Sequence, residues 1–311
     1  MQVPEPFDLD LVVRSHGWYD LAPWSWDRER RILARPLVIS RGRTLRVEAA
    51  ERGGPGGGLA LRVTAEGRVT AADAAEARAQ LGAALSLAED LAPFWRRIRE
   101  LEPERERLGL PDLRWAAARG AGRMLRSPTV FEDVVKMLCT TNCSWGLTRV
   151  AVKNLVERLG APAPLGGRAF PGAEALAARP ERFFREAIRV GYRAPFLRAI
   201  AREVAAGRLD VEAWRDPAVP EEELQRRIRA LPGFGPYATE GLLRLLGRHR
   251  HLSLDSWVRP ALRERRGLKR VPSDRTIARW FAPYGEWAGL ALWLEVTAAW
   301  HAPEPARPRR A

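Results

Sequence analysis

The 311-residue chain contains little cysteine, lysine or histidine, and each shortage excludes a class of structure. Its two cysteines, Cys139 and Cys143, are too few for a disulfide framework or for a four-cysteine iron–sulfur cluster. The four histidines show no metal-ligand spacing with thiols or carboxylates, so we predict no metal and no cofactor. No apolar run is long enough to span a bilayer, and no signal-peptide pattern is present. We therefore expect a soluble, cytoplasmic protein with no membrane association.

Only three lysines occur among 52 basic residues, so the positive charge is carried almost entirely by arginine. A high-GC prokaryotic genome favours arginine and alanine, and it accounts for arginine in place of lysine. It does not account for the excess of 52 basic over 38 acidic residues, which gives a net charge of +14. Such a charge favours a polyanionic partner through counterion release. We therefore predict a nucleic-acid partner and a nucleoid-associated location.

The pattern of apolar residues changes near residue 70 and predicts an α+β fold. Short, partly alternating segments predict strands at Leu9–Val13, Arg31–Ala34, Pro36–Ile39 and Leu59–Val63, with a glycine-rich hairpin connection at 53–58. Later segments predict helices at about 71–101, 129–138, 144–159, 173–178, 180–189, 193–206, 220–229, 236–247, 256–265, 273–281 and 285–299. We expect an N-terminal β-rich domain with a linking helix at 1–100, a helical domain at 101–301 and a disordered basic tail at 302–311.

A glycine-rich turn precedes an apolar helix in the segment Leu-Pro-Gly-Phe-Gly-Pro-Tyr. Gly233 and Gly235, on either side of Phe234, allow a tight turn and the close approach of another chain. The first amides of the following helix have no partner within the helix and point outward at the positive end of its dipole. The turn is therefore a candidate phosphate site, although similar turns also begin helices that bind nothing.

Asp255 follows Tyr237 by 18 residues, which is far enough for a helix to run back and place the carboxylate near the turn. An aspartate here can cap the helix predicted from Ser256, and a carboxylate at a helix start stays ionised. It can also stabilise a developing positive charge and orient or deprotonate a water molecule. The two roles are compatible, and Asp255 is our first candidate for a catalytic residue.

The segment from Leu231 to Asp255 resembles the hairpin, Gly/Pro-rich loop and aspartate signature of the helix-hairpin-helix DNA glycosylase superfamily. The resemblance implies excision of damaged bases from double-stranded DNA, with the aspartate promoting N-glycosidic cleavage. Members that also cleave the strand carry a lysine where this chain has Tyr237. The resemblance therefore implies a monofunctional enzyme without a strong lyase step.

Two further elements resemble the oxoguanine branch of that superfamily. Gly191-Tyr192-Arg193-Ala194 matches an element whose Tyr wedges beside the base left unpaired opposite the lesion and whose Arg contacts that base. Asn142 matches an Asn that enters the gap left by the flipped nucleotide, which has lost its stacking. The alternative interpretations are a helix start for the first element and a helix cap for Asn142. The chain departs from the branch at Leu147, which stands where the branch has an arginine that helps read the opposite cytosine.

The resemblance also implies a base pocket. Ala282–Ala288 is similar to the branch's last helix element, whose aromatic residue corresponds to Trp293, while Gly289 replaces its lesion-reading glutamine. Gly17 lies where the branch has a glycine whose carbonyl senses oxidised purines. Tyr237, Trp257 and Trp293 therefore predict an aromatic pocket near Asp255, and Gly17 is expected to line it. Aromatic faces favour cationic alkylated purines, whose glycosidic bond is already weak.

The resemblance spans the chain from about Phe7 to Trp300 and falls between the oxoguanine and the 3-methyladenine glycosylase branches. Our leading hypothesis is a monomeric, monofunctional glycosylase for a damaged base, first of all an alkylated purine. Excision of an oxidised or mispaired base by the same aspartate is the first alternative. A lesion-binding protein without turnover is the second alternative.

Overall fold

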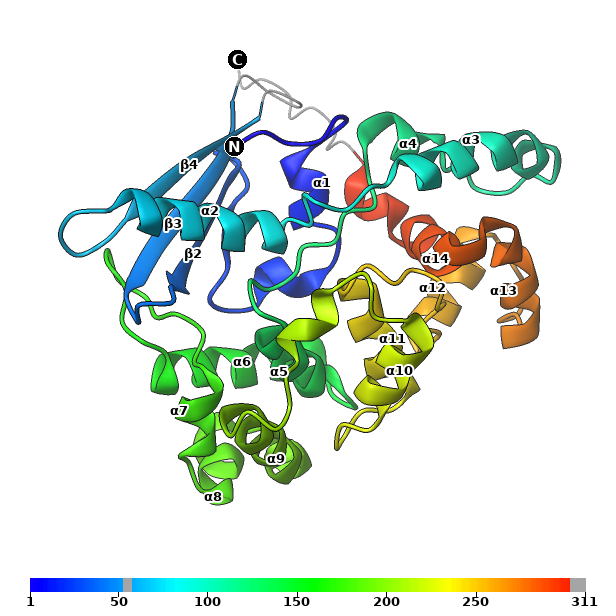
Figure 1. Ribbon diagram of the computed structural model, residues 1–311. Coiled ribbons are helices and arrows are strands. Elements are labelled where there is room, and N and C mark those ends of the chain that lie inside the picture. Colours follow the sequence, from blue (N-terminus) through cyan, green and yellow to red (C-terminus); the bar gives the residue numbers. More distant parts are fainter. Residues whose placement is uncertain (53–57, 303–311) are drawn as a thin grey trace, which may run out of the picture.

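The computed structural model describes residues 1–52 and 58–302, and its fold is α+β (Figure 1). A four-stranded antiparallel sheet has the strand order β1-β2-β3-β4. The strands are β1 (Ser25–Asp27), β2 (Ile32–Val38), β3 (Thr44–Glu51) and β4 (Leu59–Thr64). The register of the central pair places Leu37 opposite Leu45. Each strand therefore pairs with its neighbour in sequence, as in a simple meander.

Helix α2 (Ala71–Ala84) packs on the sheet, as Figure 1 shows. A small apolar cluster joins Ala77 of α2 to Leu37, Leu45 and Val47 of the sheet. Strand β3 was not predicted, although its residues alternate between buried and partly buried along the strand. The alternation of Leu45 and Val47 with polar residues was a readable signal for a half-buried strand.

Three of the expected N-terminal features are wrong. The two strands predicted at Arg31–Ala34 and Pro36–Ile39 are the single strand β2, whose pairing with β3 continues through Arg35 and Pro36. The predicted strand Leu9–Val13 is helix α1, because the side chain of Asp8 accepts a hydrogen bond from the amide of Asp10 and begins a helix there. The single helix predicted at 71–101 is two helices, α2 and α3 (Ala92–Arg107). Ser86 between them has a φ of 53°, a left-handed backbone that ends the first helix.

The remainder of the described chain is mainly helical. Its α-helices are α4 (Arg114–Arg119), α5 (Val130–Thr140), α6 (Trp145–Leu159), α7 (Ala173–Ala177), α8 (Glu181–Phe183), α9 (Ala194–Ala205), α10 (Glu221–Arg229), α11 (Pro236–Leu245), α12 (Val258–Arg265), α13 (Asp274–Phe281) and α14 (Ala288–Thr297). Short 3₁₀ turns are η1 (Gly17–Asp20), η3 (Gly191–Arg193), η4 (Glu212–Arg215), η5 (Ala282–Trp287) and η6 (Ala298–His301). Helix α4 was not predicted, and the helix predicted at 180–189 consists of α8 and the π turn η2 (Phe184–Ile188).

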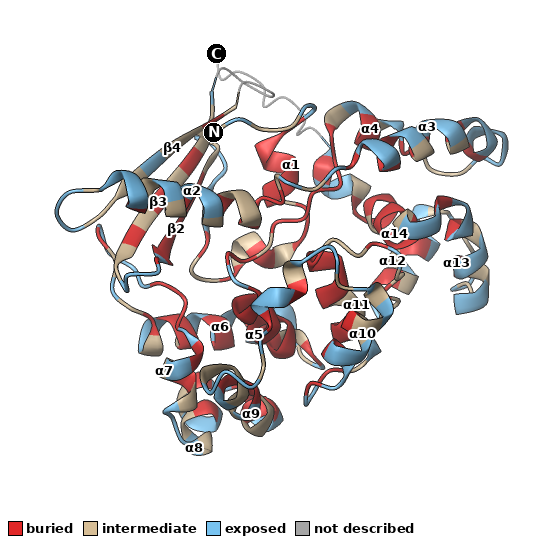
Figure 2. Ribbon diagram, in the orientation of Figure 1, coloured by how far each residue is buried: buried red, intermediate tan, exposed pale blue. Residues whose placement is uncertain are grey.

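One cluster of buried apolar side chains runs from Phe7 to Val296 and forms the main core. Helix α5 lies at its centre, with every residue from Val130 to Cys139 buried (Figure 2). In the described ranges, every helix is too short or too polar to cross a membrane. Most of the predicted 53–58 loop and of the predicted 302–311 tail lies outside the described residues.

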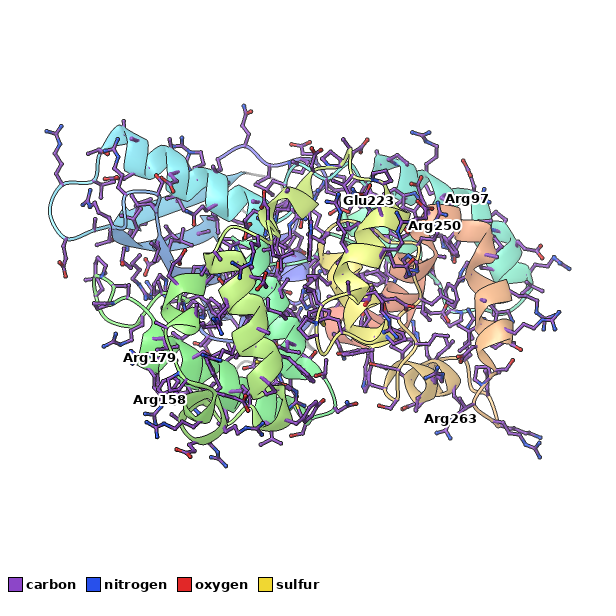
Figure 3. The ribbon with its side chains drawn as sticks, turned by 60° about the horizontal axis from the view of Figure 1, so that its bottom comes forward. Arg97, Arg158, Arg179, Glu223, Arg250 and Arg263 are labelled. Carbon is purple, nitrogen blue, oxygen red and sulfur yellow. The ribbon has the colours of Figure 1, made fainter. Side chains whose placement is uncertain are left out.

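Long arginine side chains extend from several helices into solvent, as Figure 3 shows. Arg158 at the end of α6, Arg179 after α7 and Arg263 in α12 are examples, and all three are exposed. Other arginines form ion pairs on their own helix, such as Arg227 with Glu223 in α10. The positive surplus of the sequence therefore reaches the surface on several elements.

Candidate functional site

A cleft of about 1380 Å³ lies where five distant parts of the chain meet. Its wall is formed by the N-terminal segment, the end of α5 and the loop after it, the turn before α11 with α11 itself, the loop before α12, and the C-terminal helices. Residues from these parts that line it are Arg14, His16, Gly17, Trp145, Asn142, Gly233, Gly235, Tyr237, Gly241, Arg244, Asp255, Trp257, Trp293 and Trp300. The structure thus brings the predicted catalytic residue and all four predicted pocket residues to one cavity.

The turn between α10 and α11 requires glycine at one position. Gly233 has a φ of +85°, and a Cβ there would lie 2.7 Å from Cδ2 of Phe196 and 2.8 Å from Cδ1 of Leu138. Gly235 caps α11, and Pro236 takes the first helical position, where an amide hydrogen is not needed. The Phe234 side chain is buried, and its amide donates to the carbonyl of Leu231 at 3.1 Å. Phe234 therefore anchors the turn in this structure, and the prediction that it contacts DNA stays a prediction.

Asp255 lies at the start of α12 and faces the cleft half-buried. Its Oδ1 accepts hydrogen bonds from the amides of Trp257 at 2.9 Å and Val258 at 2.6 Å. The nearby Arg259 donates to the backbone carbonyl of Asp255 and directs its guanidinium to Asp274. Over the described ranges, no ion pair includes the Asp255 carboxylate. The carboxylate is thus oriented by a helix start and not neutralised by a fixed cation.

Tyr237 occupies the first turn of α11 and is 39% exposed within the cleft. Burial raises the pKa of its phenol, and the charge of Asp255 acts in the same direction. The phenol is therefore neutral at physiological pH and is a hydrogen-bonding and stacking group. It is not a nucleophilic amine.

Three indoles form one side of the cleft. The ring of Trp257 lies 5.8 Å from that of Trp293 and 5.3 Å from that of Trp300, centroid to centroid. Trp293 is held in place because its Nε1 donates to the carbonyl of Ser15 at 2.8 Å. Trp300 was not selected from the sequence, since nothing local shows that the last 3₁₀ turn folds back to α12. The cluster places apolar faces next to Asp255.

Asn142 and Tyr192 lie together at the rim. Asn142 Nδ2 donates to the Tyr192 hydroxyl at 3.0 Å, and Tyr192 is 47% exposed. Arg193 is buried, and its guanidinium donates to the Thr141 hydroxyl at 3.1 Å and to the Thr141 and Val190 carbonyls. Arg193 therefore supports the loop that presents Asn142, whereas the sequence suggested that it contacts DNA directly. That direct contact stays a prediction.

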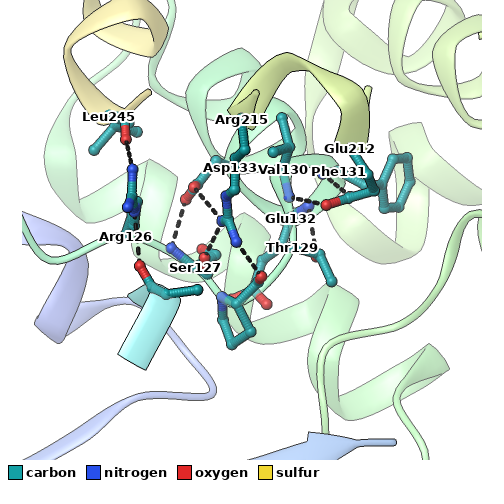
Figure 4. A network of polar contacts seen from close by, with 12 residues as sticks. Arg126, Ser127, Thr129, Val130, Phe131, Glu132, Asp133, Glu212, Arg215 and Leu245 are labelled. Carbon is teal, nitrogen blue, oxygen red and sulfur yellow. Dashed lines mark hydrogen bonds and ion pairs between the residues drawn. The ribbon is translucent and has the colours of Figure 1, made fainter. Parts of the chain in front are cut away.

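The start of α5 is fixed by the network in Figure 4. The Glu212 carboxylate of η4 accepts from the amides of Val130 and Phe131, both at 2.9 Å. Asp133 Oδ1 accepts from the Ser127 amide at 2.9 Å and from Nε1 of Trp18 at 2.8 Å. These bonds join the N-terminal segment to α5. Because α5 leads directly into the Asn142 loop, the network also positions the rim of the cleft.

Gly17 lines the cleft beneath an indole that the sequence analysis did not select. A Cβ on Gly17 would lie 2.5 Å from Cζ2 of Trp145, so only glycine fits under this ring. Trp145 Nε1 donates to Asp20 Oδ2 at 2.9 Å, which holds the ring across the N-terminal segment. Trp145 is 38% exposed. It stands beside the loop of Asn142 because α6 begins only three residues later.

Arg244 was also missed by the sequence analysis. It lines the cleft although it is only 7% exposed, and its guanidinium carbon lies 4.8 Å from the centre of the Trp293 ring. Burial lowers its pKa to about 10, so the group remains charged at neutral pH. Nothing in the sequence separates this arginine from the many exposed ones, apart from its spacing of seven residues from Tyr237 on one helix face.

Comparison with solved structures shows the fold. A 3-methyladenine DNA glycosylase from Archaeoglobus fulgidus matches with a TM-score of 0.73 at 19% identity, over 97% of this chain and 99% of that one. An 8-oxoguanine glycosylase/lyase from Clostridium acetobutylicum in complex with DNA matches with a TM-score of 0.68 at 18% identity, over 96% and 93%. Its apo-form matches with a TM-score of 0.67 at 17% identity, over 94% and 93%. No protein-family model and no curated protein sequence matches the chain. The chain therefore shares its fold with solved glycosylases of both types that the sequence resembles.

Proposed function

We propose that this protein is a monofunctional DNA glycosylase that hydrolyses the N-glycosidic bond of a damaged base flipped out of double-stranded DNA. The observation that carries the proposal is the placement of Asp255. Its carboxylate faces an aromatic cleft and belongs to no ion pair within the described residues. The cleft volume of about 1380 Å³ leaves room for a nucleotide. Solved structures that share the fold come from glycosylases of both types.

The chemistry follows from the charge on Asp255. As the bond to the base breaks, the sugar develops an oxocarbenium-like positive charge. A carboxylate held in place by the Trp257 and Val258 amides stabilises that charge without having to reorganise. The same group orients or deprotonates the water that attacks the sugar. No metal or cofactor has a role in this proposal.

None of the three lysines of the chain lines the cleft, which argues against a lyase step. The position at the start of α11 that faces Asp255 holds Tyr237, whose neutral phenol forms no Schiff base. Lys136 is fully buried in an ion pair with Glu132, at 2.7 Å. Lys153 and Lys269 do not line the cleft. A Schiff base with the sugar therefore has no lysine at the cleft on which to form.

We further propose how DNA is held. The first amides of α11, after the Gly233–Gly235 turn, face a backbone phosphate at the positive end of the helix dipole. Asn142 and Tyr192, already hydrogen-bonded to each other, fill the gap that the flipped nucleotide leaves. Arg193 positions them from behind. One monomer supplies all of these groups.

The leading substrate is an alkylated purine, because the indoles of Trp257, Trp293 and Trp300 offer apolar faces on which a purine stacks. Excision of an oxidised base is the second candidate. It is favoured by the guanidinium of Arg244, whose donors suit a base with a carbonyl group.

A panel of duplexes tests the proposal. Each duplex carries one methylated, deaminated, oxidised or mispaired base, and free base, abasic sites and strand breaks are scored separately. The proposal predicts free base and abasic sites without strand cleavage for at least one lesion. Tight lesion binding with no base released from any duplex would establish a non-catalytic binding protein instead.

A further inference from the structure

One face of α11 forms the floor of the cleft. Tyr237, Gly241 and Arg244 are spaced by four and three residues, so they lie in a row along the helix and all three line the cleft. A Cβ at Gly241 would lie 2.8 Å from Cε of Met137, so a side chain there would have to displace the end of this methionine. The floor is therefore a neutral phenol and a guanidinium separated by bare backbone. A flat base fits against such a surface.

The guanidinium of Arg244 has few partners in the protein. Nη2 reaches the carbonyl of Leu252 only at 3.5 Å, and Nε is buried without an acceptor among the described residues. No ion pair of the described chain includes Arg244. The acidic groups that act on its charge are Glu240 and Asp255. Glu240 Oε2 is itself bonded to the amide of Ser253 at 2.7 Å. A buried charged donor without a matched acceptor is costly unless a ligand supplies one.

The aromatic face next to this charge is already occupied. The guanidinium lies over the Trp293 ring at 4.8 Å, which is the position that a cationic base would take for a cation–π contact. A positively charged base in the cleft would meet Arg244 instead. Two unit charges roughly 6 Å apart at an effective dielectric constant of about 20 repel enough to weaken binding on the order of 100-fold.

We propose that Arg244 determines the substrate class of the pocket: it selects uncharged bases that present a carbonyl or ring-nitrogen acceptor, and it disfavours positively charged N-alkylated purines. The inference rests on the proposed function and narrows it. Uncharged alkylated, deaminated or oxidised purines accept hydrogen bonds from Arg244 without penalty, whereas a cationic methylpurine brings a positive charge that the guanidinium repels.

Two base analogues of the same shape isolate the charge. Duplexes carry a 2′-fluoro nucleotide, which resists hydrolysis, bearing either cationic 7-methylguanine or neutral 7-methyl-7-deazaguanine. A duplex with unmodified 2′-fluoroguanine gives the non-specific reference, and binding is followed by fluorescence anisotropy. Wild-type protein is expected to bind the neutral analogue 10- to 100-fold more tightly than the cationic one, taking the acidic neighbours into account.

Two substitutions separate charge from geometry. Arg244→Gln removes the charge and is expected to bring the affinity ratio close to one. Arg244→Lys retains the charge but loses the planar arrangement of donors. The preference for the neutral over the cationic analogue should therefore persist, while the affinity for both carbonyl-bearing bases falls. The exposed Arg62 in the sheet provides the matched control, because Arg62→Gln removes one charge far from the cleft and leaves the ratio unchanged.

Equal or tighter wild-type binding of the cationic analogue would overturn the inference, even if Arg244→Gln proved unable to fold. An unchanged ratio in a folded Arg244→Gln protein would do the same. These outcomes are independent of catalysis, since both analogues are stable. The glycosylase proposal is tested separately by the panel of hydrolysable duplexes, and it fails if no base is released from any of them.

Discussion

Replacing Asp255 with asparagine separates the two roles of this residue. Asparagine keeps the oxygen that accepts from the amides of Trp257 and Val258, so the start of α12 remains capped. The free energy of unfolding should change by less than about 1 kcal/mol. The negative charge, however, is lost.

The catalytic effect is much larger. A carboxylate roughly 3.5 Å from a developing sugar cation, at an effective dielectric constant of about 20, stabilises it by about 3 to 5 kcal/mol, depending on how much charge has developed. Single-turnover base release by the Asp255→Asn variant should therefore be slower by a factor of about 10² to 10⁴. DNA affinity should be retained, because the phosphate-facing groups are untouched.

The assay measures free base under single-turnover conditions and DNA affinity by anisotropy, on the lesion that the wild-type protein excises best. Asp210→Asn is the matched control: Asp210 is an exposed aspartate whose side chain accepts from the Ala213 amide at 3.2 Å, outside the cleft. Asp255→Ala should lose the cap as well, for a further cost of about 0.5 to 2 kcal/mol in stability. Base release by Asp255→Asn within tenfold of the wild-type rate would refute the assignment of Asp255.

Three further predictions concern other parts of the structure. Borohydride should trap no covalent complex of the wild-type protein with DNA, whereas a Tyr237→Lys variant places an amine beside the sugar and should give one; an efficient wild-type trap would contradict the monofunctional assignment. Gly233→Ala should lower the free energy of unfolding in urea by about 1 to 3 kcal/mol more than Gly207→Ala, since both positions have positive φ but only the first adds a steric clash. Burial lowers the pKa of His16 to about 3 and that of His301 to about 4, so each is neutral when folded and takes up a proton on unfolding below pH 6.5. Stability should therefore fall by about 1.4 kcal/mol per pH unit per histidine as the pH drops from 6.5 toward 4, and His16→Gln should flatten the dependence measured by urea denaturation; an unchanged slope would show that His16 does not titrate in this way.

The sequence predicted those parts of the fold whose signals are local. The apolar helices of the second half begin and end close to the predicted residues, because caps such as Ser144 and Ser273 stand directly before them. The predicted strand at Leu9–Val13 was wrong, since a five-residue run buried on all sides has no clear periodicity. There the capping side chain of Asp8 was the better signal.

The candidate site was predictable where one short segment contains both the backbone turn and the reactive side chain. The Gly233–Gly235 turn and Asp255 lie within 25 residues of one another, and the structure places both at the cleft. Arg244, Trp145 and Trp300 were not predictable, because their role depends on contacts between segments far apart in sequence. Arg193 is a different case. Its motif was recognised in the sequence, but its contact with Thr141 could not be predicted, because that contact depends on how the chain folds.

The packing of Trp257, Trp293 and Trp300 at one wall of the cleft gives the protein an internal optical reporter. The three indole rings lie within 5.8 Å of their nearest neighbours in the cluster, so excitation of one is shared among them. They are three of the chain's 12 tryptophans, and a purine stacked on them would quench up to about a quarter of the intrinsic emission if all twelve emitted equally. Entry of a base into the cleft is thus observable in unlabelled protein, separately from contacts with the phosphate backbone outside.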